Sequence, residues 1–137
     1  MFMKKVMLNA ELSKAVFDRK PSLYKPKECY ANIYRAATEF NDEISSGKWK
    51  ITYGYYDVSC CSPILLARHC FFLNENNEVI DPTVFTRKEN NLNHTYYVMY
   101  VFQNWKNYFS AIIEEMYYPA LEKYLKSICE SKVVGIL

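Results

Sequence analysis

The sequence predicts an α+β fold in which a helix that carries a cysteine packs on a small antiparallel sheet and a C-terminal helix closes the structure. A helical pattern over residues 28–44 is followed by several strand-like segments. A polar turn between two apolar segments, over residues 70–80, predicts a β-hairpin. An apolar stripe over residues 105–131 predicts the last helix.

Length and charge limit the class of protein. The chain has 137 residues, of which 50% are hydrophobic, so we expect a single domain over residues 1–137 with a proper core. The 17 basic residues nearly balance the 15 acidic ones. A net charge this close to zero predicts neither a nucleic-acid partner nor an anionic membrane.

The start of the chain and its cysteines predict the cellular compartment in which the protein is found. The start is basic but is not followed by a sustained apolar run, so we expect no signal peptide. No stretch approaches the roughly 18 apolar residues of a membrane span. The five cysteines are then expected to be reduced thiols in a cytoplasmic protein.

The first third of the chain reads as two helices joined by a proline-containing connection. Apolar residues at roughly helical spacing predict a short helix over residues 4–18, and Pro21 and Pro26 mark the connection after it. The helix over residues 28–44 begins at Cys29, just after that break. Its apolar face is formed by Cys29, Ile33, Ala36, Ala37 and Phe40.

The middle of the chain predicts an antiparallel sheet of about four strands. Alternating residues over 48–58 indicate the first strand, a loop follows over 59–64, and the hairpin supplies the next two strands. A polar connection over residues 85–94 leads to a β-rich run over 95–103. The catalytic-like core then covers about residues 25–103, and Pro119 is expected to break or kink the C-terminal helix.

Three side chains in this arrangement predict nucleophilic chemistry. If the hairpin strands pair, His69 and Asp81 lie at the same end of it, so the carboxylate can orient the imidazole. Cys29 lies at a helix start, where the helix dipole and a nearby imidazolium favour the reactive thiolate. The order of Cys29, His69 and Asp81 therefore predicts a nucleophile, a general base and acid, and an orienting group for acyl transfer.

A developing oxyanion also needs donors. Backbone N–H groups at the start of the cysteine helix are suited to this role. Asn32 lies about one turn after Cys29, so we consider it as a further oxyanion or substrate-positioning residue. The alternative is that Asn32 only forms hydrogen bonds near the helix start.

Four segments together resemble the core of transglutaminase-like and papain-like cysteine enzymes, including small bacterial and phage members. The resemblance implies cofactor-free hydrolysis, deamidation or acyl transfer at an amide or thioester carbonyl of a protein or peptide-like substrate. It covers about residues 25–84. Relatives often have a small residue and then Trp after the histidine, where this chain has Cys70 and Phe71, so the pocket shape stays open. The segments are Glu28-Cys29-Tyr30-Ala31-Asn32, Tyr53-Gly54-Tyr55, Arg68-His69-Cys70-Phe71 and Val79-Ile80-Asp81-Pro82-Thr83.

Two other interpretations compete with the enzyme. Cys60, Cys61, His69 and Cys70 are possible zinc ligands, but adjacent cysteines rarely reach one ion, and neighbours on a strand point to opposite faces. We therefore expect no metal site. The second alternative is an inactive relative that binds a host partner protein or a small ligand in the same cleft, as a phage or mobile-element product would.

Overall fold

Five antiparallel strands form one curled sheet in the computed structural model, which describes residues 4–57, 66–87, 92 and 95–124. The strand order is β1-β5-β2-β3-β4, so β1 and β4 form the edges. The strands are β1 (Lys4–Met7), β2 (Trp49–Asp57), β3 (Leu66–Asn74), β4 (Val79–Ile80) and β5 (Thr95–Val101).

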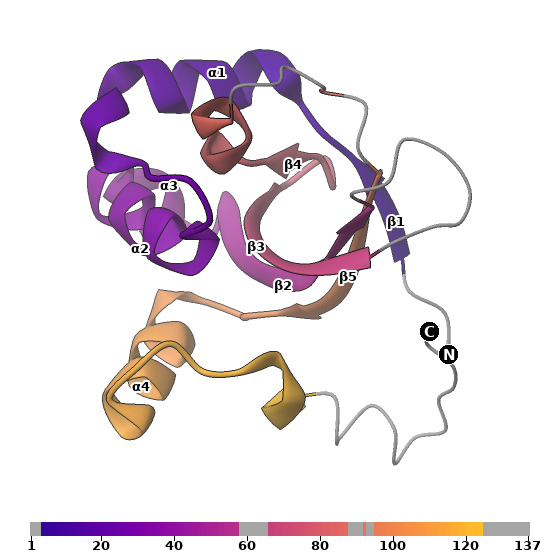
Figure 1. Cartoon of the computed structure of the whole chain (residues 1–137). Coiled ribbons are helices and arrows are strands. Elements are labelled where there is room, and N and C mark those ends of the chain that lie inside the picture. Colours follow the sequence, from indigo (N-terminus) through magenta and orange to yellow (C-terminus); the bar gives the residue numbers. More distant parts are fainter. Residues whose placement is uncertain (1–3, 58–65, 88–91, 93–94, 125–137) are drawn as a thin grey trace.

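The two edges of the sheet come together. Leu8, just after β1, forms a parallel bridge with Val79 of β4, and the Asn9 N–H donates to the Val79 carbonyl at 2.9 Å. Figure 1 shows the resulting curl of the sheet. The curl brings together an apolar cluster made of Val6, Phe71, Leu73, Val79 and Tyr96.

Helices cover the other face of the sheet. The larger core cluster joins Ile33 and Ala36 of α2 to Tyr53 of β2 and Phe72 of β3. Ala36 and Ala37 of α2 are buried at this contact, and their small side chains leave room for the helix to lie against the sheet. Figure 1 shows the helices arranged around the curled sheet. They are α1 (Ala10–Arg19), α2 (Cys29–Glu39), α3 (Asn41–Ser45) and α4 (Trp105–Glu115), with 3-10 turns η1 (Pro21–Leu23) and η2 (Pro82–Thr86).

The prediction of a helix over residues 4–18 was wrong at its start. Residues 4–7 form β1 and pair with β5, and the helix begins only after Asn9, whose side chain accepts from the Leu12 N–H at 2.9 Å. Val6 is buried against the curled sheet, so tertiary pairing decides the conformation of this segment. The sheet accordingly has five strands where about four were expected.

The other predicted elements are confirmed with shifted ends. The helix predicted over residues 28–44 is present as α2 and α3, which meet at Phe40. The hairpin pairs Phe72 with Ile80 and Leu73 with Val79. The last helix ends earlier than predicted, because Met116 adopts a left-handed φ of 57°. Helical backbone resumes at residue 121, and the predicted span beyond residue 124 lies outside the described residues, as does the predicted loop over 59–64.

Gly54 is required by the close approach of β5 to β2. The register between these strands shifts between Tyr53 and Gly54, and a Cβ at residue 54 would overlap the Tyr97 carbonyl oxygen. We expect Gly54→Ala to lower the free energy of unfolding by about 3 kcal/mol, because the strands must separate. Urea unfolding measures the change.

Gly47→Ala is the matched control for this prediction. Gly47 has a φ of 79° but no atom within 4 Å of a built Cβ, so its replacement costs only backbone strain of about 1 kcal/mol. Equal losses in the two variants would contradict a steric role for Gly54.

Candidate active site

His69 and Asp81 form a buried pair at one end of the hairpin. His69 lies in β3, and Asp81 follows β4 directly, so the pairing of these two strands brings together residues 12 positions apart. The His69 Nε2 lies 2.7 Å from the Asp81 Oδ2. His69 is 2% exposed and Asp81 is 0% exposed, so little water competes for this contact.

Cys29 completes the arrangement from the start of α2. Its thiol interacts with the His69 ring closely enough to raise the pKa of that ring. Because Nε2 is already engaged by Asp81, the thiol is left with Nδ1. Cys29 is partly exposed while its two partners are buried. The structure thus brings Cys29, His69 and Asp81 together, and Cys29 is the most exposed of the three.

His69 and Asp81 each stabilise the charged form of the other. Burial lowers the pKa of His69, but the charge of Asp81 and hydrogen bonds with Asp81 and Cys29 outweigh it and raise that pKa to about 9. Burial raises the pKa of Asp81, but the charge of His69 and hydrogen bonds from His69 and Tyr96 outweigh it, so the pKa is lowered. The imidazole therefore carries a proton at neutral pH and faces an ionised carboxylate.

Three further groups hold Asp81, and the sequence did not indicate them. The Tyr96 hydroxyl donates to the Asp81 Oδ2 at 2.7 Å, and the Thr83 N–H donates to Oδ1 at 3.2 Å. The Asp81 N–H in turn donates to the Ser13 Oγ at 2.9 Å. These contacts come from α1, η2 and β5; Thr83 of η2 is a local partner, whereas α1 and β5 lie far from Asp81 in the sequence.

Tyr56 and Arg87 pack beside the imidazole. The ring centroids of Tyr56 and His69 lie 4.3 Å apart. Arg87 lies over the Tyr56 ring at 4.6 Å and donates to its hydroxyl at 2.5 Å. Its positive charge is one of the weaker influences that lower the pKa of Asp81. Tyr56 therefore limits the movement of the His69 ring.

The Asn32 side-chain amide has no spare donor to offer beside Cys29. Its amide nitrogen donates to the Lys25 carbonyl at 2.8 Å and to the Thr83 Oγ1 at 3.0 Å. Its oxygen accepts from the Lys25 N–H at 3.0 Å and from Arg35 at 3.1 Å. Because both amide hydrogens are used, the geometry favours a positioning role: Asn32 ties the start of α2 to the segment that carries Asp81.

The part of the chain that the structure describes holds no group of three metal-ligating side chains. Cys70 is fully buried in the core under α2, and as the neighbour of His69 on β3 it points to the opposite face of the sheet. Cys60 and Cys61 lie outside the described residues.

The described residues enclose a pocket of about 370 Å³ whose lining does not include Cys29, His69 or Asp81. Its lining includes Tyr30, which follows Cys29, and Arg68, which precedes His69; the rest comes from residues 117–122.

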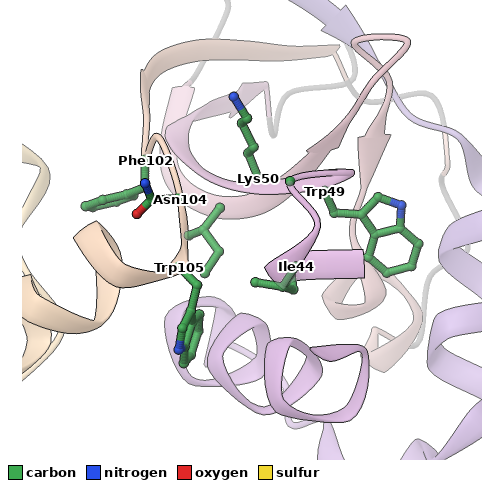
Figure 2. Close-up of a pocket in the computed structure, with 8 residues that line it drawn as sticks. Ile44, Trp49, Lys50, Phe102, Asn104 and Trp105 are labelled. Atoms are coloured by element: carbon green, nitrogen blue, oxygen red, sulfur yellow. The ribbon is translucent and has the colours of Figure 1, made fainter. Parts of the chain in front are cut away.

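A second hollow, shown in Figure 2, lies between α3, β2 and the start of α4. In Figure 2 the Lys50 side chain points away from Ile44 and Trp105. This second hollow measures about 10 Å³, room for one water at most, so it is a packing gap in the core.

Comparison of the chain with protein-family models, with curated proteins and with solved structures gives no match. Among the helices of the described residues, none combines the length and the apolar character needed to cross a membrane.

Proposed function

We propose that the protein is a cysteine hydrolase or acyltransferase that acts on an amide or thioester carbonyl of a protein or peptide-like substrate. The observation that carries the proposal is the buried contact of 2.7 Å between His69 and Asp81, with Cys29 near enough to raise the pKa of His69. In this proposal Cys29 is the nucleophile, His69 the general acid and base, and Asp81 the orienting group.

In the acylation step, the Cys29 thiolate attacks the carbonyl carbon and forms a C–S bond, while the carbonyl π electrons move to oxygen. The tetrahedral intermediate collapses, and the C–N bond of an amide breaks. The His69 imidazolium gives its proton to the leaving nitrogen and becomes neutral. The products are a thioester on Cys29 and a free amine.

In the second step, the neutral His69 takes a proton from the acceptor as the acceptor attacks the thioester carbon. The C–S bond then breaks and the thiolate–imidazolium pair is restored. Water as the acceptor gives hydrolysis, and an amine gives acyl transfer. Asp81 stays ionised throughout and stabilises the imidazolium, in keeping with its lowered pKa.

The start of α2 is suited to stabilise the oxyanion. Asn9 caps α1 and Asn104 caps α4, each by accepting a backbone N–H, whereas Glu28 forms no such bond at the start of α2. The Glu28 carboxylate pairs with Arg35 at 3.1 Å instead. Backbone N–H groups beside Cys29 are therefore left for a developing negative charge.

The fold agrees with the resemblance to transglutaminase-like and papain-like enzymes. A curled antiparallel sheet supplies the histidine from one strand and the aspartate from the end of the next, and a helix that begins at the cysteine packs on this sheet. We propose that the chain adopts a core of this type, extended by β1 and by the C-terminal segment.

The test is the rate of alkylation of each cysteine by iodoacetamide from pH 5 to pH 10, read by mass spectrometry. We expect Cys29 to react at pH 6 at least about tenfold faster than the other four thiols, because the protonated His69 stabilises a thiolate. The buried Cys70 is an internal control, since burial raises its pKa. If Cys29 instead reacts at the rate of an ordinary exposed thiol, the proposed enzymatic activity is excluded. The alternative of an inactive protein that binds a partner or ligand is then favoured.

A further inference from the structure

Tyr96 connects the histidine–aspartate pair to the middle of the sheet. It lies in β5, where its backbone pairs with Val6 of β1 on one side and with Tyr56 of β2 on the other. Its side chain is 1% exposed and lies in the apolar cluster of the curl, with its ring centroid 5.2 Å from that of Phe71. Paired strands on both sides and a packed ring therefore leave the Tyr96 hydroxyl little freedom to move.

The hydroxyl of Tyr96 and the ring of His69 meet at the same oxygen of Asp81. The Tyr96 Oη lies 2.7 Å from the Asp81 Oδ2, and the His69 Nε2 also lies 2.7 Å from that oxygen. Such short distances are typical of hydrogen bonds to an ionised carboxylate. The Thr83 N–H reaches only the other oxygen, Oδ1, at 3.2 Å. Within the described part of the chain, Tyr96 is thus the only side chain besides His69 that donates to Asp81.

Tyr96 can only donate at this contact. Burial raises the pKa of Tyr96 well above its ordinary value, and the charge of Asp81 raises it further, so the hydroxyl keeps its proton at neutral and acid pH. A hydroxyl that donates to a carboxylate stabilises its ionised form, and does so strongly where little water competes. The Tyr96 hydroxyl therefore opposes the effect of burial on Asp81, which by itself favours the uncharged acid.

The other groups around the pair act on Asp81 without donating to its carboxylate, as far as the described residues show. Arg87 lies over the Tyr56 ring and influences Asp81 through its charge. From α1, the group in contact is the Ser13 hydroxyl, which accepts from the Asp81 backbone and does not titrate. The charged or titratable groups around the pair are Cys29 of α2, Tyr56 of β2, Cys70 of β3 and Arg87 after η2.

We propose that Tyr96 is a positioning residue for the reaction, because its hydroxyl keeps the Asp81 carboxylate ionised and directed at His69. This role rests on the proposed function. While Asp81 is ionised, His69 holds its proton and the Cys29 thiolate keeps its counter-ion; once Asp81 is protonated, the buried imidazole loses that support. Tyr96 thus acts through Asp81 and not on the substrate.

Tyr96→Phe tests this role, since it removes the hydroxyl and keeps the ring. We expect the pKa of Asp81, read from the carbon-13 NMR signal of its carboxyl group, to rise by about one unit, the scale of one lost hydrogen bond to a charge. The acid limb of the pH profile of Cys29 alkylation should move to higher pH by a similar amount. The rate between pH 7 and pH 8 should change by less than about threefold, because Asp81 is ionised there in both proteins.

Tyr108→Phe is the matched control. Tyr108 is 0% exposed and thus as buried as Tyr96, but its hydroxyl has no hydrogen-bond partner among the described residues. It belongs to the larger core cluster, on the face of the sheet that the helices cover. Its replacement should leave both the Asp81 signal and the alkylation profile unchanged.

Each result bears on one of the two proposals. An Asp81 pKa that does not rise in Tyr96→Phe would overturn the role of Tyr96 alone. So would a Cys29 rate that falls equally at every pH, since that result indicates a general disturbance of the site. If the Asp81 pKa rises but Cys29 of the unmodified protein reacts like an ordinary thiol, the proposed function fails and the hydrogen bond is only structural.

The unmodified protein supplies a second measurement that does not depend on the folding of Tyr96→Phe. The Tyr96 hydroxyl proton, shielded from water, should give a slowly exchanging NMR signal that shifts as Asp81 takes up its proton in acid. A signal that stays in place while Asp81 is protonated would rule out the proposed role.

Discussion

Asp81→Asn is expected to slow the reaction of Cys29 with iodoacetamide by about a hundredfold at pH 6, the scale of a lost general acid–base partner. The charge of Asp81 is the main influence that keeps the buried His69 protonated, since burial alone lowers the pKa of His69. Without that charge, burial lowers the pKa of His69, so the imidazole loses its proton and the thiolate loses its counter-ion. With a substrate in hand, turnover should fall by about 10⁴-fold, because the asparagine amide also favours the wrong imidazole tautomer.

The same substitution should lower the free energy of unfolding by about 3 kcal/mol, as expected when one partner of a buried ion pair is removed. Asp18→Asn is the matched control. Asp18 pairs with Lys14 at 2.8 Å, but both side chains are more than half exposed, so its loss should change stability by less than about 1 kcal/mol and leave the alkylation rate unchanged. An Asp81→Asn protein with the original Cys29 rate would contradict the orienting role of the carboxylate.

The stability of the protein is expected to decrease as pH rises from about 6.5 to above 9. The pKa of His69 is raised from an ordinary value of 6.5 to about 9 in the folded state, so the folded protein holds a proton that the unfolded chain releases. This contribution is complete below about pH 6.5 and is lost as pH rises through about 9; it amounts to about 3 kcal/mol. Urea unfolding at a series of pH values measures the slope.

The ionisation of Asp81 determines how the stability of the protein changes at acid pH. Its pKa is lowered below the ordinary value of 3.8, so its contribution is complete above about pH 4 and is lost as pH falls through the folded-state value. The pair should therefore stabilise the fold most between about pH 4 and pH 6.5.

A neutral pair is the control for this profile. In the double variant His69→Gln with Asp81→Asn, the decrease between pH 6.5 and pH 9 should flatten. The raised pKa values of Cys70 and Tyr24 also reduce stability in alkali, but both groups are retained in the variant and are subtracted by the comparison. An unchanged slope in the double variant would show that other groups cause the pH dependence.

The local sequence determined the parts of the site that lie close together along the chain. Pro26 and the apolar spacing after it place the start of α2 at Cys29, and this start is confirmed. The Asn- and Glu-rich turn before Val79 specifies a tight hairpin, so the contact between His69 and Asp81 follows from a separation of only 12 residues. Such features depend on helix caps, turn composition and short-range pairing, which a sequence pattern reports directly.

The remaining parts of the site were decided by tertiary structure, because strand register and sheet closure depend on distant partners. Tyr96 reaches Asp81 only because β5 pairs with β2 in a register that sets Tyr96 opposite Tyr56, and Gly54 of β2 opposite His69. Asn32 is a helix residue whose buried partner, Thr83, lies 51 positions away.

Residues 4–7 are another segment whose conformation the local sequence did not determine. Their apolar spacing fits a short helix, but pairing with β5 makes them a strand. The pocket too depends on a contact between the start of α2 and residues 117–122, which no local pattern reports. The sequence by itself therefore determined the helix that begins at Cys29 and the hairpin that joins His69 to Asp81. Packing between distant segments decided what holds Asp81, what occupies Asn32 and what lines the pocket between Tyr30 and residues 117–122.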